Sequence, residues 1–440
     1  MSWKLVWYNL IHDKRRTLVG ILGVSFAAIL MLMQLGFLEV VRRTATSILD
    51  RLDFDILVVS TTYHYLYDSG SFPRFLLDEV QSVPGVREAV PLYVGFDAWS
   101  REVQGPLRGE ASAPSSRDSE QRAVFTLGFN LSDLPFVPAA VEGLNLSVMS
   151  GDGRGCVKVA RPEGLKDLPA LKPPDTILID RLSHRDYGFA TFSPCPAPRR
   201  DFWSRVLKAD PDLARRPAVK ILVGHRPVDL VGEFDLPLGF GADAAILVSD
   251  ENFSRLFGGR SLDQVSLGLV RVRIGSDPDA VASDLEAELS GDDVRVMTRA
   301  VSRDREIAYW VGEQPIGMIF KLGLVIACAV GMVFVYQILS SDITHRFSEY
   351  ATLKAMGRSG ASVSWQVVQL ALFLAHGAYF PALLVSVVLE RIIRYATLMP
   401  IEMTLGDALE VYGATCLVCI ASAVLAIGKV RRADPADLFA

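Results

Sequence analysis

The chain has 440 residues, half of them hydrophobic, and a formal net charge of −5. No segment interleaves clustered basic residues with aromatic ones, so nothing in the composition points to a nucleic-acid-binding protein. The six histidines show no metal-ligand spacing, and no nucleophile stands with a base in a catalytic pattern, which argues against an enzyme. Residues 151–158 come nearest to an ATP-binding loop, but their spacing is wrong for the motif that cradles phosphates. Any ATP would therefore act through another chain.

Four charge-free hydrophobic runs organise the sequence, one near the N-terminus and three in the C-terminal part. A helix needs about 20 apolar residues to cross a bilayer. The first run is longer than the ~7–15 apolar residues of a secretory signal, and a poor cleavage site follows it. We therefore predict four membrane spans and one large domain between the first two. The spans are expected at residues 17–40, 315–341, 359–389 and 411–428, and the domain at residues 41–314.

Basic residues in the short segments beside the spans predict the orientation, because such segments stay in the cytoplasm. We expect both termini and the connection 342–358 on that side, with an amphipathic helix at 1–16 and a tail at 429–440. The loop 390–410 carries four acidic residues and is expected outside, together with the large domain. The basic residues concerned are Lys4, Lys14, Arg15, Arg16, Arg346, Lys354, Arg358, Lys429, Arg431 and Arg432.

Two strand–helix–strand units bracket the outer domain, at residues 50–100 and 262–310. In the second unit, Asp277 is the expected helix N-cap and Pro278 occupies the first helical position. Together the units are predicted to form one α/β subdomain near the membrane. Their strands are expected at 55–60, 89–94, 265–274 and 294–297, and their helices at 72–83 and after Asp277.

The middle of the outer domain differs in pattern. Residues 124–250 carry short β-like runs at 176–179, 219–223 and 244–248, and we predict that they form an inserted, β-rich subdomain. Residues 104–122 and 193–198 have the composition of loops. Cys156 and Cys195 both fall outside the cytoplasm in this scheme, where a disulfide can form, but the sequence does not say whether they pair.

Small residues recur at helix-packing spacing within the spans. Gly23 and Ala27 share a face of the first span, and Gly323, Ala327 and Gly331 share a face of the second. Such spacing lets helices approach closely, so we expect these residues to pack helices within the chain or between two copies of it. His376 lies inside the third span, where we expect it to serve helix packing.

The connection after the second span is short and partly amphipathic, as expected for a helix that projects into the cytoplasm between two spans. A segment in this place can receive force from a partner protein, although an ordinary solvated connection would have the same pattern. The residues predicted to couple the chain to an ATPase are Arg346, Glu349, Tyr350, Leu353, Lys354, Met356 and Gly357.

The run Glu349-Tyr-Ala-Thr-Leu-Lys-Ala-Met-Gly357 resembles the signature of FtsX/MacB-type ABC-transporter permeases, and so does the C-terminal run 431–437. The resemblance extends over nearly the whole chain and is closest to the DevC family. Segments 104–122 and 190–218 depart from that family pattern. The other similar runs are Gln34–Phe37, Gly239–Asp243, Tyr309-Trp310, Pro315–Gly317 and Val335–Leu339.

This resemblance implies a fold and a function. The fold is a MacB-like α-helical membrane protein with four transmembrane helices (1+3) and a large extracytoplasmic α/β domain. The protein would lie in a bacterial inner membrane with the domain in the periplasm. Two permeases would pair in the membrane. The chain itself would bind no cofactor, since ATP and Mg would be bound by a cytoplasmic ABC ATPase subunit.

The resemblance also implies further partners. A periplasmic adaptor of the membrane-fusion type would bind the outer domain and meet an outer-membrane channel, so that motion of the domain expels a lipid-like or other hydrophobic cargo. Two alternatives share this architecture, namely an FtsX-like regulator of a periplasmic cell-wall hydrolase and a Lol-like lipoprotein-releasing permease. The sequence does not name the cargo or say whether the dimer contains one or two kinds of permease.

Overall fold

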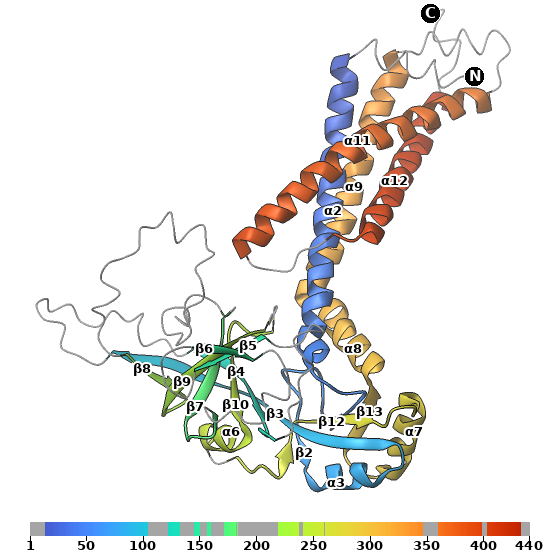
Figure 1. The fold of residues 1–440 in the computed structure, drawn as a ribbon. Coiled ribbons are helices and arrows are strands. Elements are labelled where there is room, and N and C mark those ends of the chain that lie inside the picture. Colours follow the sequence, from blue (N-terminus) through green and yellow to red (C-terminus); the bar gives the residue numbers. More distant parts are fainter. Residues whose placement is uncertain are drawn as a thin grey trace, which may run out of the picture. The chain divides into compact units, whose positions relative to one another are not determined.

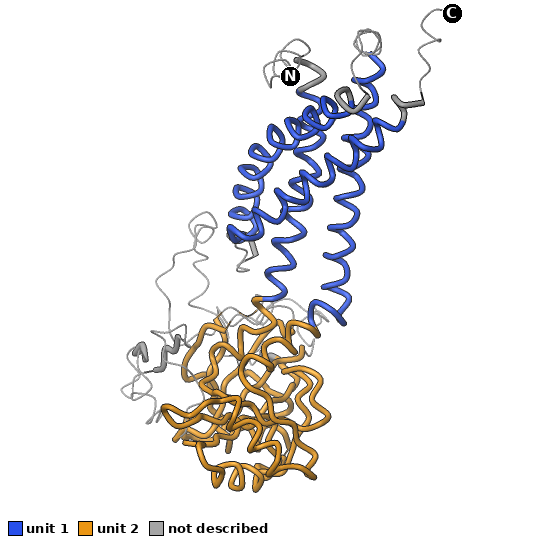
Figure 2. The backbone as a smooth tube through the Cα atoms, turned by 90° about the vertical axis from the view of Figure 1, so that its right-hand side faces the viewer, with its two compact units in different colours: residues 1–42, 310–440 blue, residues 43–309 orange. Residues whose placement is uncertain are grey.

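Four long helices carry the hydrophobic runs, and each is long and apolar enough to cross a membrane. They are α2 (Lys14–Arg51), α9 (Pro315–His345), α11 (Gly360–Thr397) and α12 (Leu405–Arg432). The computed structural model describes residues 14–103, 122–132, 145–149, 156–159, 171–181, 183, 219–236, 241–258, 260–345, 360–397 and 403–432. The chain divides into a membrane unit, residues 1–42 and 310–440, and an outer unit, residues 43–309 (Figure 2).

Helix α2 extends beyond the predicted end of the first span at residue 40 and continues to Arg51. The last turn of α2 packs in the outer unit, because Ile48 and Leu49 belong to the hydrophobic core of that unit. Helices α11 and α12 likewise reach into the predicted loop 390–410, so that residues 398–404 connect them. Lys14 opens α2, while the rest of the predicted N-terminal helix lies outside the described residues.

Small side chains dominate the centre of the membrane unit. One buried cluster joins Val24 of α2, Val335 of α9, Ala371 of α11 and Ala423 of α12. Helices in lipid gain little from burying apolar surface against each other, so close backbone approach through small residues is what holds them together. Large apolar side chains such as Leu384 face outward instead.

One mixed sheet forms the outer unit, and in the described residues it has eleven strands. In spatial order they are β13 (Val294–Thr298), β1 (Ile56–Ser60), β12 (Leu267–Val272), β3 (Val86–Val103), β4 (Arg122–Phe129), β10 (Ala245–Ser249), β7 (Thr176–Asp180), β9 (Arg226–Asp235), β5 (Asn145–Met149) and β6 (Cys156–Val159), with β8 (Val219–Val223) paired to β3 and β9. A short ladder joins β2 (Phe72–Pro73) to β11 (Gln264–Val265).

The first four strands in this order come from the two predicted strand–helix–strand units. The first unit is β1, α3 (Phe75–Ser82) and β3, and the second is β12, α7 (Pro278–Glu288) and β13. All neighbouring pairs among them are antiparallel, which gives a ferredoxin-like split βαβ arrangement. Asp277 caps α7 as predicted, and its side chain accepts a bond from the Asp279 N–H at 3.2 Å.

Strand β3 connects the two subdomains that the sequence predicts. Its 18 residues pair in turn with β12, β4 and β8, so the sheet is continuous across the expected boundary (Figure 1). The predicted strands at 176–179, 219–223 and 244–248 are present as β7, β8 and β10. The β-rich insertion therefore extends the α/β sheet, and no break in the sheet separates the two.

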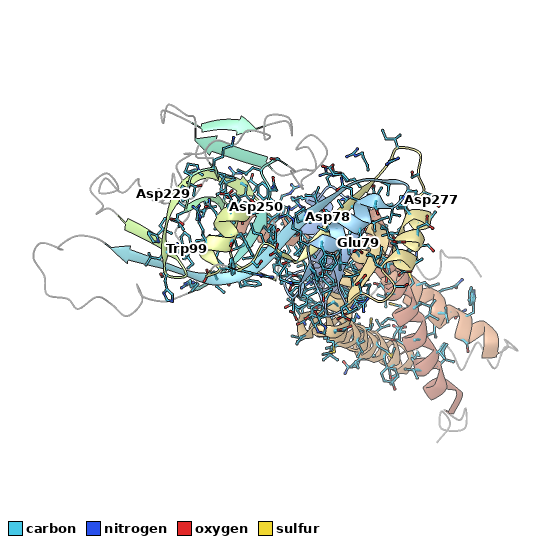
Figure 3. All side chains as sticks on the ribbon, turned by 90° about the horizontal axis from the view of Figure 1, so that it is seen from below. Asp78, Glu79, Trp99, Asp229, Asp250 and Asp277 are labelled. Carbon is cyan, nitrogen blue, oxygen red and sulfur yellow. The ribbon has the colours of Figure 1, made fainter. Side chains whose placement is uncertain are left out.

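Both faces of this sheet are covered. Leu57 and Val59 of β1 point into one core, while Ile56 and Val58 point into the other, which explains the continuous apolar run of that strand. The second core is closed by helices: α3 and α7, with α6 (Asp250–Leu256) farther along the sheet. Figure 3 shows this helical layer from below, with Asp78 on α3, Asp277 at the start of α7 and Asp250 at the start of α6.

The side chain of Asn252 fixes α6 to the loop before β7. Asn252 is buried, and its Oδ1 accepts a bond from the Asp175 N–H at 3.1 Å. Its Nδ2 donates to the carbonyl groups of Pro173, at 3.1 Å, and Thr176, at 3.2 Å. Asp175 has a positive φ of 63°, a conformation that few residues adopt without support. One amide group thus holds the strained turn in place.

We expect Asn252→Ala to lower the free energy of opening of α6 and β7 by about 1–3 kcal/mol, because buried backbone groups lose their partners. Amide hydrogen exchange of the full chain in detergent measures this opening. Glu251→Ala, on the exposed side of α6, is the matched control and should leave exchange unchanged. Equal protection of β7 in both variants would contradict the assigned role.

Candidate coupling site

The segment predicted to meet an ATPase lies outside the described residues. Helix α9 ends at His345 and α11 begins at Gly360. All seven predicted coupling residues lie between these helix ends, outside the described residues, so their role stays a prediction. They are Arg346, Glu349, Tyr350, Leu353, Lys354, Met356 and Gly357.

The predicted small residues bring α2 and α9 together inside the membrane unit. A Cβ atom built on Gly331 would lie 3.0 Å from the Cβ of Ala27, and one built on Gly23 would lie 3.4 Å from the Phe334 ring. Ala27 and Ala327 are each 1% exposed. These contacts show helix packing within one chain.

Two more glycines allow close approach at the start of α9. A Cβ on Gly323 would lie 2.6 Å from the Gln34 amide, and one on Gly317 would lie 2.4 Å from the Val311 carbonyl oxygen. Val311 belongs to the π-helical turn η6 (Tyr309–Glu313), which precedes α9. Such turns are rare and often occur at functional positions. A side chain at Gly317 would collide with backbone and could not be accommodated by a rotamer change.

The outer unit is attached to the membrane unit at two places in the sequence, and the sheet joins them. Strand β1 follows the end of α2, and α8 (Arg299–Ala308) follows β13. Because β1 and β13 are paired from Ile56–Thr298 to Ser60–Val294, the incoming and outgoing segments are neighbours in one ladder. A displacement of either segment therefore acts on the same edge of the sheet.

Arg299, the first residue of α8, ties these segments together more directly. Its guanidinium group donates to the carbonyl oxygens of Leu49, Asp50, Leu52 and Phe54, at distances from 3.0 to 3.3 Å. The last carbonyls of a helix have no partner within it, and a cation there also meets the negative end of the helix dipole. The same group lies 4.9 Å from the centre of the Phe54 ring. Arg299 thus caps α2 from α8.

A second arginine of α8 strengthens this connection. Arg303 forms a short ion pair with Asp50 of α2. The other carboxylate oxygen of Asp50 accepts a bond from the Thr46 hydroxyl at 2.9 Å, one turn earlier in the helix. Asp50 is therefore held in a fixed rotamer, and α8 contacts α2 through two arginines one turn apart.

The same face of α8 also holds the loop after β1, because Glu306 lies two turns after Arg299 in the helix. Glu306 is fully buried, and its Oε1 accepts bonds from the Tyr63 hydroxyl and from the Leu66 N–H, the latter at 2.9 Å. Burial raises the pKa of Tyr63 well above its ordinary value, and the nearby Glu306 carboxylate raises it further. Tyr63 consequently stays a donor across the physiological pH range. Tyr65 of the same loop stacks on Tyr309 with 4.2 Å between ring centres.

His376 makes two hydrogen bonds within the membrane unit. Its Nδ1 donates to the Leu372 carbonyl oxygen at 2.6 Å, so Nε2 of the neutral ring accepts from the Tyr412 hydroxyl, also at 2.6 Å. The bond to Tyr412 links α11 to α12. The structure places His376 in contact with a neighbouring helix, in keeping with the packing role expected for it.

The described cysteines and acidic residues form neither a disulfide nor a metal-binding group. Cys328, Cys416 and Cys419 are free, and no group of three or more His, Cys, Asp or Glu side chains described here is placed to hold a metal ion. The side chain of Cys156 and the whole of Cys195 lie outside the described residues, so their pairing stays open.

Comparison with known proteins bears on the C-terminal part of the chain. Residues 321–435 match the family of FtsX-like permease C-terminal domains. The matched region contains α9 from Lys321 onward, the connection 346–359, α11 and α12. These three helices are therefore similar to that family, and the match covers about a quarter of the chain. The comparison with curated proteins found no match.

Two solved structures are similar to part of the chain. The extracellular domain of the noncanonic ABC-type transporter YknZ from Gram-positive bacteria is 13% identical, with a TM-score of 0.29, over 56% of this chain and 99% of its own. The periplasmic region of MacB from Actinobacillus actinomycetemcomitans is 10% identical, with a TM-score of 0.32, over 60% of this chain and 96% of its own. Similarity at this level establishes neither a shared fold nor a shared function.

We expect Arg299→Met to raise amide exchange in β1 and β13, because hydrogen bonds to a charged group contribute about 1.5–3 kcal/mol. Arg299→Lys should recover part of the protection, since it restores the charge without the planar fork. Arg87→Met, at an exposed position, serves as the control. Unaltered exchange in Arg299→Met would show that the cap does not stabilise this edge.

We expect Gly331→Leu to destabilise the membrane unit by about 1–3 kcal/mol, because the new side chain must push α9 away from Ala27. Thermal unfolding of the full chain in detergent measures the loss. Gly413→Leu makes the same change on α12, where a built Cβ meets nothing within 4 Å, and should be neutral. Equal midpoints for the two variants would argue against close α2–α9 packing.

Proposed function

We propose that this chain is the permease subunit of an ABC transporter. The observation that carries the proposal is the FtsX-like match, because it includes three membrane helices and the cytoplasmic connection between two of them. The chain has no phosphate-binding motif of its own, so ATP and Mg are assigned to a separate ABC ATPase subunit. The permease itself requires no cofactor and is not an enzyme in this scheme.

The proposed mechanism is mechanical. The ATPase would bind the connection 346–359 and displace α9, whose start follows α8 and η6 in sequence. In the outer unit, Arg299 and Arg303 fix α8 to the end of α2, and β13 and β1 are paired. Motion that arrives through either attachment would therefore move the sheet as a whole and would not separate β13 from β1.

The finer part of the proposal rests on the DevC-like sequence motifs. We assign the protein to a bacterial inner membrane, with both termini in the cytoplasm and the outer unit in the periplasm. Two copies would form a homodimer, and the outer unit would engage a membrane-fusion-type adaptor that leads to an outer-membrane channel. The cargo would be lipid-like or otherwise hydrophobic.

The proposal predicts that Glu349→Lys and Gly357→Pro uncouple the permease from its ATPase. Reversing the charge removes an acceptor from the connection, and proline disrupts its backbone. The measurement is ATPase activity of the co-purified complex in vesicles, together with the amount of ATPase retained. Glu410→Lys makes the same charge reversal at an exposed position near the start of α12 and should keep both.

Wild-type coupling in both variants would exclude this connection as the transmission element. The proteins that co-purify with the wild-type chain test the wider proposal. An adaptor supports export, whereas a cell-wall hydrolase or a lipoprotein cargo would replace export by the FtsX-like or the Lol-like alternative. Absence of any ATPase from the complex would contradict the ABC assignment itself.

A further inference from the structure

A buried carboxyl group lies near the end of α11, within the membrane-spanning part of that helix. Glu390 is 4% exposed, although the apolar helix Ser364–Arg394 surrounds it in sequence. It faces α2 at Gly36, where a Cβ atom would lie 3.4 Å from the Glu390 Oε1. Ionisable side chains in such positions are costly, and where they occur they commonly have a functional role.

The surroundings of Glu390 do not compensate a negative charge. The Met403 N–H donates to its carboxyl group, but Oε1 is buried and has no hydrogen-bond partner in the described residues. No described lysine or arginine forms an ion pair with it. A carboxylate in this state would cost several kcal/mol relative to water.

The charged groups of the neighbouring helices offset one another. Arg394 on α11 attracts a negative charge at Glu390, and Asp407 on α12 repels it. Asp407 is itself fixed by the Thr404 N–H at 2.9 Å. On α2, Glu39 lies one turn from Gly36 and is paired with Arg42 at 3.7 Å. Lys321 of α9 is exposed.

A second polar group without a partner lies on the same face of α11. Ser386 is fully buried, and its Oγ has no hydrogen-bond partner. Residues four apart on a helix are neighbours, so the hydroxyl of Ser386 and the carboxyl group of Glu390 can reach each other. The Ser386 hydroxyl could donate to an ionised carboxylate, but the negative charge would stay buried, whereas a proton on the carboxyl group removes the charge and supplies a donor to the Ser386 Oγ.

We propose that Glu390 is a proton-binding site, protonated at neutral pH in the packed bundle, with Ser386 accepting the hydrogen bond of the carboxylic acid. The neutral acid removes the cost of a buried charge and gives Oε1 a partner. Gly36 contributes by leaving no side chain between α2 and this pair. The proposal concerns the membrane unit alone and does not depend on the transport function proposed above.

Proton binding at this position is linked to helix packing. The ionised carboxylate needs water, and a movement of α11 away from α2 at Gly36 would expose it to water. Release of the proton and separation of these helix segments therefore accompany each other, and high pH favours the separated arrangement. The site would make the bundle sensitive to proton concentration at the end where α11 leads into α12.

Infrared spectroscopy of the full chain in lipid nanodiscs tests the proposal. At neutral pH we expect the C=O band of a protonated carboxylic acid, lost in Glu390→Gln and kept in the exposed control Glu410→Gln. Glu306→Gln serves as a second control, because it removes the other buried glutamate described above. Ser386→Ala should retain the band but shift it to higher wavenumber, since the acid loses its acceptor.

Labelling the wild-type protein with ¹³C-glutamate provides an assignment that does not require any variant to fold. A protonated band that moves to lower wavenumber on labelling belongs to glutamate. A wild-type spectrum with carboxylate bands alone at neutral pH would overturn the proposal, as would a band unaffected by Glu390→Gln. A carboxylate band that responds to added sodium would identify a cation site in place of a proton site.

Discussion

The outer unit depends on one arginine at the start of α8. Arg299 binds four backbone carbonyl groups, those of Leu49 and Asp50 in the last turn of α2 and those of Leu52 and Phe54 just after it. Because β1 begins just after those carbonyls and β13 ends just before Arg299, the cap and the β1–β13 ladder reinforce each other. The core residues Ile48, Leu49 and Leu52 then pack under the sheet from a helix whose end is fixed.

The continuous sheet extends this local constraint over the whole outer unit. Strand β3 passes from the ferredoxin-like part into the inserted part without a break, and each face of the sheet has its own core. Strands covered on both faces cannot shift register without exposing apolar side chains. The inserted strands are therefore held in register with β1 and β13, even though most of them lie far from either attachment in sequence.

Local patterns in the sequence were sufficient to predict the four long apolar helices, most strands and the Asp277 cap, because hydropathy and capping act over a few residues. The cap by Arg299 could not be predicted, since nothing in its neighbours indicates a partner some 250 positions earlier. In the sequence, Glu306 and Glu390 look like ordinary acidic residues, and only their burial in the structure distinguishes them. The end of α2 was missed because its last turn is amphipathic and packs in the outer unit. The small residues at Gly23 and Gly331 were recognisable by spacing, but their partners Phe334 and Ala27 were not.

The pairing of β1 with β13 has a consequence for how such a chain can diversify. The first strand of the outer unit, β1, and its last strand, β13, are adjacent in the sheet. The two chain ends of the unit therefore lie close together. Insertions within it need not alter the distance between those ends, and therefore need not alter the spacing of the helices that follow. A membrane domain of constant design can in this way carry outer domains of very different size.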